Sequence, residues 1–549
     1  MIRGTILTKN YSHFSIQDSD NNTVFEFDGA KLANPALHGD MVELSLETEH
    51  SIKVIERGRH PILAGLLDLK SRTIYGMTSR NVPIYLFYPF DKRYPPFRVG
   101  CSEKDRTHNR LAIVEFADFT KSDIFPRGNL VRLIGVAGDL DVEQEALAHT
   151  VSPYCKTESK LSSSILSSIL PSRDDGYCTH SLIDDEWMTA NIDPDGCKDI
   201  DDAVSFKMLP SGAWLCIISI ADVDAVVREG SPIDTYARST LQTVYNSGVP
   251  VKPMLPPILS ESMCSLVPGS PKPVVSLSFK YVPSNLTGNR IVDVQFEHLH
   301  LVNKISYTYE NIYDASDAFP VKILQEVASE MAGEPITDSH EWVAQLMKFY
   351  NLRAAAALGS QGIYRAHKGP VKEKLDALMG IQETLNSIDP SIFQSLSNSA
   401  ASYAILKADD SDITHHGFDG QLYCHATSPI RRYADLHNQR ILKKIIHGTP
   451  IESHVDSTLV YKLNEVSKAS RNYDRICTFL KAISIADSVE SIIISRNSSK
   501  MQVYILPWRM TFNLPATVSS EEPGRKIFLK YYFDSSKKSW KERMVFNQV

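Results

Sequence analysis

Five aspartates crowd into the segment NIDPDGCKDIDDAV, which runs from Asn191 to Val204. They stand at positions 193, 195, 199, 201 and 202. Two carboxylates about 4 Å apart repel each other by roughly 4 kcal/mol at an effective dielectric constant near 20. Such acids can splay into water, share protons through raised pKa values, or surround a divalent cation. Most acidic runs are simply solvated, so the rest of the sequence has to decide between these alternatives.

The spacing of the acids excludes an EF-hand calcium loop. Counted from Asp193, glycine falls at the fourth position and Val204 at the twelfth, where an EF-hand has glycine sixth and glutamate twelfth. Magnesium fits better, because it binds through a few carboxylates and leaves positions open for water and a substrate phosphate. The segment therefore indicates a magnesium site suited to cleaving phosphodiester bonds.

The elements that position this loop belong to a chain of several domains. The chain has 549 residues, and a prior of roughly 100 to 200 residues per domain predicts about three to five domains. The composition, 43% hydrophobic and 22% charged, is typical of a soluble protein. We expect no membrane span, since no window approaches the ~20 consecutive apolar residues that one requires. The amino terminus has neither a signal nor a transit pattern, so we expect an intracellular, cytoplasmic protein.

Charge and cysteine content narrow the function classes only a little. A net charge of −7 argues against wholesale wrapping by nucleic acid, but an enzyme can confine its basic residues to one channel. The eight cysteines are scattered without a CxxC pair, so we expect neither structural zinc nor disulfides.

Strand and helix patterns divide the chain into five segments. Short alternating runs predict small antiparallel OB-type barrels at residues 1–58 and 59–155. The serine-rich segment 156–180 is interpreted as a linker with a short helix, and residues 181–488 as a mixed α/β domain. Residues 489–549 return to short strands and predict a third, possibly reduced, OB-type barrel. The fold class is thus multidomain α+β.

Four segments resemble one known family in their order along the chain. They are IDP followed by KDIDDA, YNSGVPVKPMLPPILSESMCSLVPG from Tyr245, IYRAHKGP from Ile363, and YCHATSPIRRYADLHNQRIL from Tyr423. In these segments the sequence is similar to the ribonuclease II and ribonuclease R exoribonucleases, whose catalytic domain is called RNB. The segments NPALHGDMVEL and FPRGNLVRLIGVAGD resemble parts of that family's two cold-shock barrels, and the tail resembles its S1 barrel.

The resemblance implies a hydrolase that degrades single-stranded RNA from its 3′ end and releases nucleoside 5′-monophosphates. It implies two Mg²⁺ ions, with Mn²⁺ as a substitute. The family match gives the metal ligands as Asp193, Asp199, Asp201 and Asp202, with Asp201 also catalytic. Asp195 falls at a variable position of the signature, and we expect it to be a solvated turn residue.

The segment ATSPIRRYADL predicts a phosphate-binding helix start. Ser428 is expected as the N-cap and Pro429 as the first helical residue, which would leave backbone N–H groups facing outward. The family pattern implies that Arg431 is catalytic and that Arg432 binds RNA, since a guanidinium can hold two phosphate oxygens. The alternative is that both arginines pair with acids of the loop.

Three further residues are expected to contact RNA. Tyr245 matches an aromatic residue of the family that stacks on a base, although a tyrosine there, taken alone, would more often serve packing. His415 and Tyr423 match family positions and are expected to line the site beside His425. We assign them no acid–base role, because a two-metal mechanism needs no protein base.

Three positions depart from the family pattern. Ala344 stands where a glutamate is usual, Tyr350 replaces a small residue, and Gln439 stands where a histidine is common. Without this carboxylate, it is in doubt how the 3′-terminal nucleotide is bound. The product length and the selectivity for RNA over DNA are in doubt for the same reason.

Two other function classes compete with the exoribonuclease. One is a catalytically inactive RNB-fold regulator that binds RNA, and the other is a scaffold within an RNA-decay assembly. We expect a monomer, with RNA-decay proteins as potential partners, and no endonuclease domain before the first barrel. Lysines of the tail could help RNA to enter or could simply cover an exposed barrel face; they are Lys526, Lys530, Lys537, Lys538 and Lys541.

Overall fold

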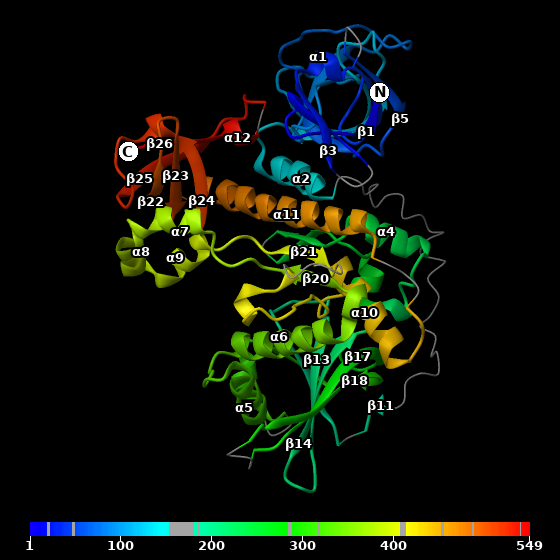
Figure 1. Cartoon of the computed structure of the whole chain (residues 1–549), viewed down its shortest axis with the longest axis vertical. Coiled ribbons are helices and arrows are strands. Elements are labelled where there is room, and N and C mark those ends of the chain that lie inside the picture. The colour runs from blue at the N-terminus through cyan, green and yellow to red at the C-terminus, as the bar shows by residue number, and fades with distance from the viewer. Residues whose placement is uncertain are drawn as a thin grey trace. The chain divides into compact units, whose positions relative to one another are not determined.

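The computed structural model describes most of the chain (Figure 1). The chain divides into two compact units. The described residues are 1–18, 22–46, 50–152, 181–184, 186–246, 248–283, 288–315, 319–406, 413–451, 455–485, 488–538 and 540–549. One unit comprises 1–156, 380–389 and 469–549, and the other 157–379 and 390–468. The predicted linker with its short helix, 156–180, lies outside the described residues.

The first unit begins with a five-stranded antiparallel sheet. Its strands are β1 (Ile2–Thr8), β2 (His13–Gln17), β3 (Thr23–Asp28), β4 (Met41–Ser45) and β5 (Ser51–Glu56), in the order β3-β2-β1-β4-β5. The short helix α1 (Ala30–Ala33) follows β3. Alternate residues point inward, and Ile6, Phe14, Ile16, Val42 and Leu44 form the core.

A second set of strands closes into a barrel. They are β6 (Leu63–Leu67), β7 (Ile84–Pro89), β8 (Phe97–Gly100), β9 (Arg110–Asp118) and β10 (Arg127–Val136), in the order β10-β8-β7-β6-β9. The helix α2 (Leu140–Val151) follows, with the carboxylate of Asp139 accepting from the backbone N–H groups of Asp141 and Val142. Its buried residue Leu147 faces the protein interior.

The carboxyl-terminal part of the first unit is a third small sheet (Figure 1). It contains β22 (Ser488–Arg496), β23 (Lys500–Ile505), β24 (Met510–Pro515), β25 (Lys526–Phe533) and β26 (Met544–Gln548), in the order β24-β23-β22-β25-β26, with α12 (Trp540–Arg543) before the last strand. Arg543 forms a fully buried ion pair with Glu143 of α2 at 2.8 Å. Two of the tail lysines are ion-paired, Lys526 with Glu490 and Lys538 with Asp68.

The second unit is built on a seven-stranded mixed sheet with order β11-β18-β17-β14-β13-β12-β19. The strands are β11 (Ser181–Leu182), β12 (Met188–Asp193), β13 (Asp202–Met208), β14 (Trp214–Ala221), β17 (Pro271–Tyr281), β18 (Ile291–Val302) and β19 (Ile305–Thr308). They are rich in apolar residues, as expected of strands covered by helices.

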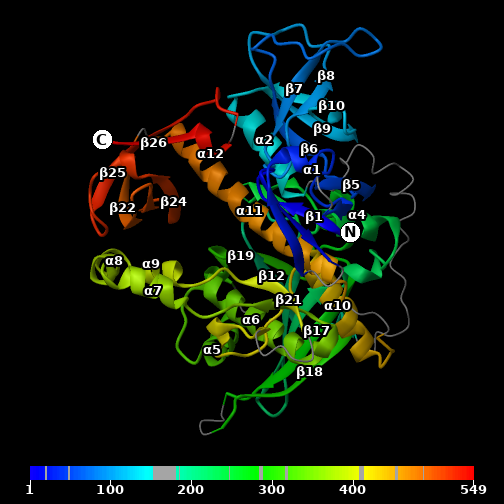
Figure 2. The same cartoon turned by 45° about the horizontal axis from the view of Figure 1, so that its top comes forward.

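Helices α5 (Val321–Ala332), α6 (Ser339–Leu358) and α10 (Tyr433–Ile446) pack beside this sheet (Figures 1 and 2). Their buried side chains, including Leu324, Trp342, Leu346 and Ile441, share one core with Phe279 of β17.

Further α-helices and β-strands in the described part of the chain are α4 (Pro232–Thr240), β15 (Val244–Asn246), β16 (Val249–Lys252), β20 (Ile363–Ala366), α7 (Lys372–Met379), α8 (Gln382–Ile388), α9 (Pro390–Ser397), β21 (Ser402–Ile405) and α11 (Ser457–Ile483).

The sequence predicts neither a membrane span nor disulfides, and the described residues bear on both predictions. Among them, no helix combines the length and apolarity needed to cross a bilayer. The six cysteines in the described part of the chain are all free thiols.

Candidate active site

The acidic loop connects two neighbouring strands of the seven-stranded sheet. Asp193 is the last residue of β12 and Asp202 the first of β13, so the sheet itself holds both ends of the loop. Asp195 lies exposed in a turn next to Gly196, whose φ of +76° suits glycine. The structure therefore places Asp195 in solvent, as expected, and keeps the other four acids at least half-buried.

Asp201 is the most deeply buried acid of the loop, with 4% of its surface exposed. Its Oδ1 accepts a hydrogen bond from the backbone N–H of Ile430 at 2.9 Å. Its Oδ2 lies 3.3 Å from Nε of Arg431 and accepts no hydrogen bond from any described residue. Burial raises the pKa of Asp201 to about 7, although the Arg431 charge acts in the opposite direction.

The neighbouring carboxylates influence one another. Burial raises the pKa of Asp202 well above its usual range, and the charges of Asp193 and Asp201 add to that effect. Burial also raises the pKa of Asp193, whose Oδ2 accepts a hydrogen bond from Nδ2 of Asn191 at 2.8 Å. Burial is thus the main cause of both pKa shifts, and the negative charges of neighbouring aspartates add to it.

Asp199 is joined to Tyr245, the predicted base-stacking residue. The hydroxyl of Tyr245 donates to Oδ2 of Asp199 at 2.5 Å, and the thiol of Cys197 lies 3.7 Å from Oδ1. Tyr245 is half-buried on β15. Burial raises the pKa of its hydroxyl, and the neighbouring Asp199 carboxylate raises that pKa further. The structure brings Tyr245 to the acidic loop, as a hydrogen-bond donor to one of its acids.

The predicted helix start at Ser428 and Pro429 is wrong. The helix α10 begins at Tyr433, with Arg432 at its N-cap position. The reason is a turn in which Ser428 O accepts hydrogen bonds from the backbone N–H groups of Arg431 (3.3 Å) and Arg432 (3.0 Å).

Two carboxylates take the backbone donors that were expected to face outward. The N–H of Ser428 donates to Oδ1 of Asp435 at 2.9 Å, and that of Ile430 donates to Asp201. This part of the chain therefore binds side chains of the protein instead of presenting an open helix terminus.

The two adjacent arginines have different surroundings. Arg432 pairs with Asp435 at 2.7 Å, with 24% of the arginine side chain exposed. Arg431 faces Asp201 and keeps 42% of its side chain exposed. Only Arg431 pairs with an acid of the loop, so the alternative of two loop-paired arginines is wrong for Arg432.

His415 and Tyr423 lie together in an aromatic cluster with Phe418. The ring centres of His415 and Tyr423 are 5.3 Å apart, and Phe418 stacks on Tyr423 at 4.4 Å. Nδ2 of Asn351 donates to the Tyr423 hydroxyl at 3.1 Å, and burial lowers the pKa of His415 to about 4. His425, nearby in sequence, shares a hydrogen bond with the Tyr403 hydroxyl at 3.1 Å.

The three positions that depart from the family pattern have separate structural settings. Ala344 is half-buried on α6. Tyr350 is buried and donates from its hydroxyl to Val275 O at 3.0 Å. Gln439 connects α10 to the end of β14, since its Nε2 donates to Ala221 O at 2.7 Å and its Oε1 accepts from Val223 N at 3.1 Å.

Sequence reasoning missed Tyr309 and Asp435. Tyr309 directly follows β19, which runs parallel to β12 with Thr308 opposite Asp193. Burial raises the pKa of Tyr309 to about 12, and the nearby charges of Asp193 and Asp202 contribute. The strand pattern gave no signal for this pairing, whereas the spacing of Asp435 three residues after Arg432 on a predicted helix could have suggested an ion pair.

The donor atoms of the loop suit a hard divalent cation. The buried Oδ2 of Asp201 lacks a hydrogen-bond donor, and the crowded carboxyls have raised pKa values. A cation would satisfy both conditions. Within the described residues, however, no three carboxylate, imidazole or thiol groups already stand as a ready metal-binding set. The residues of the loop therefore fit a divalent metal by the chemistry of their donor atoms.

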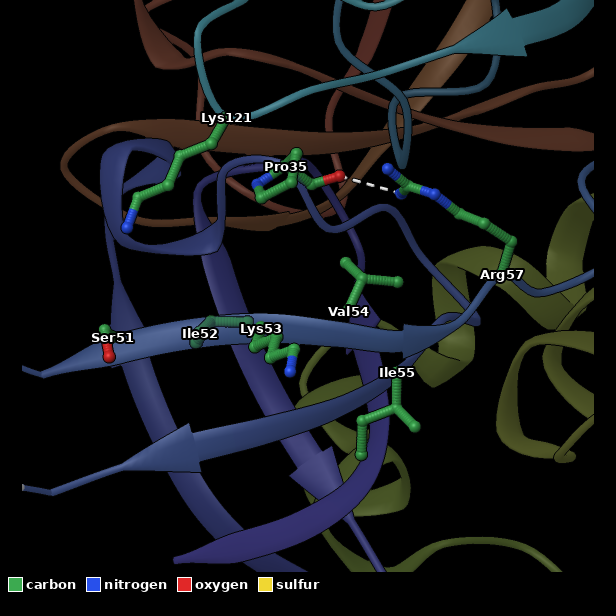
Figure 3. Close-up of a pocket in the computed structure, with 8 residues that line it drawn as sticks. All are labelled: Pro35, Ser51, Ile52, Lys53, Val54, Ile55, Arg57 and Lys121. Atoms are coloured by element: carbon green, nitrogen blue, oxygen red, sulfur yellow. Dashed lines mark hydrogen bonds between the residues drawn. The ribbon is translucent and has the colours of Figure 1, made fainter.

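The first unit has a separate hollow of about 520 Å³ on its first sheet. Its eight lining residues come mainly from the edge strand β5, together with Pro35, Arg57 and Lys121 (Figure 3). Arg57 donates to Pro35 O and pairs with Asp40, which fixes one wall of the hollow. None of the predicted site residues lines it.

Comparison with family models decides the classification. Residues 184–322 and 312–448 match the model of the RNB domain. The chain belongs to the RNB family. Residues 84–151 also match the Dis3-like cold-shock domain 2, so the RNB family recognised from the sequence and the predicted fold class are both confirmed. The domain boundaries at 58, 155, 180 and 488 remain predictions.

Curated relatives of this RNB protein are distant in sequence. The human exosome complex exonuclease RRP44 is 23% identical in an alignment 601 positions long, which covers 89% of this chain and 61% of that protein. Exoribonuclease 2 of Serratia proteamaculans is 27% identical over 349 residues, covering 52% of this chain and 53% of the relative. The chain thus spans about half to three fifths of the length of these relatives.

Solved structures share the RNB fold over nearly the whole chain. RNase R of Mycoplasma genitalium, in complex with ribose-methylated single-stranded RNA, has a TM-score of 0.74 and 17% identity, with both chains fully covered. Yeast Ssd1, described as a pseudonuclease, has a TM-score of 0.69 and 17% identity, covering 98% of this chain and 80% of Ssd1. The fold is therefore shared by a nuclease and by a pseudonuclease.

Proposed function

We propose that this RNB protein is a divalent-metal-dependent exoribonuclease that hydrolyses single-stranded RNA from the 3′ end to nucleoside 5′-monophosphates. The observation that carries the proposal is the meeting of Asp201 and Arg431. It joins an acidic loop with a half-exposed guanidinium, which is the charge arrangement that phosphoryl-transfer chemistry requires.

Asp193, Asp199, Asp201 and Asp202 would hold the metal, for which Mg²⁺ is the first choice and Mn²⁺ a substitute. Once bound, the metal would supply Lewis acidity at the phosphate and lower the pKa of the attacking water. Because burial raises the pKa of Asp201 to about 7, ionising this carboxyl at neutral pH depends on nearby positive charge.

Arg431 is proposed to bind the scissile phosphate. Its side chain is 42% exposed, so part of the guanidinium can reach a substrate while Nε stays near Asp201. Charge that develops on the phosphate oxygens in the transition state would be offset by this guanidinium. Ile430 supports the arrangement, since its N–H holds Asp201 next to the arginine.

The remaining predicted contacts concern substrate binding. Tyr245, His415 and Tyr423 are proposed to contact the RNA strand, with aromatic rings that stack on bases of any sequence. Arg432 is a weaker candidate, because its guanidinium already pairs with Asp435. We propose that the protein acts as a monomer and that any partners are proteins of RNA decay, since one relative is named as an exosome complex exonuclease.

A labelled oligoribonucleotide tests the direction and products of the reaction. With a 5′ label and magnesium, the proposal predicts a shortening series that ends in a short 5′ remnant. Blocking the 3′ hydroxyl should stop the reaction, and EDTA should do the same. Internal fragments from the 3′-blocked RNA would contradict the exonuclease and favour an endonuclease.

A second candidate is an RNA-binding regulator without catalysis. Two observations favour it: the fold match to the pseudonuclease Ssd1, and the lack of a ready metal-binding set among the described residues. This candidate predicts RNA binding with no magnesium-dependent shortening under any condition. The retention of all four loop aspartates beside Arg431 is the reason for preferring the enzyme.

A further inference from the structure

Two aromatic rings stack beside the acidic loop. Tyr309 follows β19, and His340 lies in the first turn of α6. Their ring centres are 4.0 Å apart, and the planes differ by 15°. Neither residue belongs to the segments that resembled the RNB family in the sequence.

Hydrogen bonds fix the backbone at Tyr309 and the ring of His340. The hydroxyl of Ser339 donates to Tyr309 O at 2.7 Å, which fixes the start of α6 against the end of β19. Asp338 Oδ1 accepts from the backbone N–H of His340 at 3.0 Å and lies 3.1 Å from its Nδ1. The histidine ring is therefore oriented from both its backbone and its side chain before any ligand arrives.

The pair remains accessible to a ligand. Of the His340 side chain, 60% is exposed, whereas Tyr309 is half-buried behind it. A half-buried ring that supports an exposed one is the arrangement of a stacking platform, because the outer ring keeps its orientation while offering surface to a base.

The strand pairing fixes the location of the platform. Thr308 lies opposite Asp193 in the parallel pairing of β19 with β12, so Tyr309 emerges beside the first acid of the loop. Burial raises the pKa of the Tyr309 hydroxyl, and the charges of Asp193 and Asp202 contribute to the same shift. A nucleotide whose phosphate reached the loop would therefore bring its base close to these rings.

We propose that Tyr309 and His340 form a stacking platform for one nucleobase of the bound RNA, with His340 as the contacting ring. This inference rests on the proposed function, because it assumes that an RNA strand reaches the acidic loop. Ala344 lies one helical turn after His340, and its methyl group can form no hydrogen bond to a nucleotide. Recognition at this part of α6 then depends on the aromatic surface of His340, which tolerates any base.

Base stacking on an aromatic side chain changes affinity by roughly 5- to 150-fold per base. If the His340 ring stacks on one base, removing the ring and removing that base eliminate the same interaction, so the two losses of affinity should not add. A purely structural histidine would lack this coupling to one position of the RNA. The experiment measures that coupling with oligoribonucleotides in which one abasic residue is moved along the 3′-terminal positions. Binding is measured in the full chain carrying Asp201→Asn, so that hydrolysis does not consume the ligand.

The variants are His340→Ala, His340→Phe and the control Glu341→Ala, an exposed neighbour on the same helix. We expect His340→Ala to weaken binding of intact RNA about tenfold, and the abasic residue to do the same to the His340 protein at one position. At that position the two losses should not add. His340→Phe should restore both the affinity and the coupling, and Glu341→Ala should change neither.

If the affinity losses from His340→Ala and from the abasic residue add at every position, the platform is overturned. It is also overturned if the His340→Phe protein binds RNA as weakly as the His340→Ala protein and both melt at the same temperature. Failure of the proposed function gives a different result. A wild-type protein that never shortens RNA but shows the coupling would refute the exonuclease and support the platform.

Discussion

Nε of Arg431 lies 3.3 Å from Oδ2 of Asp201, although the arginine precedes α10 and the aspartate ends the acidic loop before β13. The contact depends on the turn from Ser428 to Arg432, since Ile430 in that turn donates its N–H to the same aspartate. The geometry of the site is thus shared between a sheet and the turn that precedes α10, within one compact unit.

Replacing either of the two adjacent arginines should affect a different property of the protein. Arg431→Ala should lower kcat by about 10²- to 10³-fold with little change in thermal midpoint, because its half-exposed guanidinium contributes chiefly to the reaction. Arg432→Ala should destabilise the fold by about 3–5 kcal/mol, because it leaves the fully buried Asp435 carboxylate without its cation. Single-turnover rates and denaturant unfolding distinguish the two. Equal loss of stability in both variants would contradict the assignment.

Asp435 is expected to act on catalysis through the turn. Asp435→Asn weakens the charge-assisted bonds to Ser428 N and Arg432, so Ile430 and Arg431 should lose their fixed positions. We expect kcat to fall about 10- to 100-fold with KM nearly unchanged, as for other small misplacements of reacting groups. Steady-state kinetics measure the two constants separately. A rise in KM at constant kcat would show that Asp435 serves substrate binding instead.

The stability of the metal-free protein should depend on Asp201 ionisation. Burial raises the pKa of Asp201 from its ordinary value of 3.8 to about 7 in the folded chain. The neutral carboxyl therefore favours folding fully below the lower pKa, and this contribution is lost as the pH rises through the higher one. In EDTA, the thermal midpoint of Asp201→Asn should exceed that of wild type by more at about pH 8 than at about pH 5. Asp195→Asn, a change at an exposed position, is the control; a pH-independent difference for Asp201→Asn would be evidence against the burial effect.

The buried ion pair between Glu143 and Arg543 is predicted to stabilise the first unit. Glu143→Leu should destabilise that unit by about 3–5 kcal/mol, since it strands a fully buried guanidinium. The double variant Glu143→Leu/Arg543→Met should recover most of this loss, because it removes both charges. Chemical denaturation followed by tryptophan fluorescence reports the difference, as Trp540 lies beside Arg543. A double variant no more stable than the single one would contradict the pairing.

Local patterns in the sequence were sufficient for much of the fold. Alternating apolar residues such as Val42 and Leu44 mark strands, because every second side chain of a strand faces the core. The acidic loop was recognisable because crowded carboxylates need a physical reason, and the exposed position of Asp195 followed from its place in the signature.

Structural features that depend on long-range contacts could not be predicted from the local sequence. Ser428 and Pro429 have the residue types of a helix start, yet side chains of Asp201 and Asp435 take the backbone donors, and α10 begins at Tyr433. Tyr309 was missed because its position depends on the parallel pairing of β19 with β12, two strands far apart in the sequence. Tertiary structure overrides local preference at both places.

If the acidic loop performs hydrolysis, Asp201→Asn should abolish RNA degradation. The measurement compares wild type, Asp201→Asn and the matched control Asp195→Asn for magnesium-dependent shortening of a labelled single-stranded oligoribonucleotide, with RNA affinity measured in parallel. We predict that Asp201→Asn loses degradation while keeping nearly the wild-type affinity, and that Asp195→Asn keeps both. Equal degradation rates for Asp201→Asn and wild type would contradict the account.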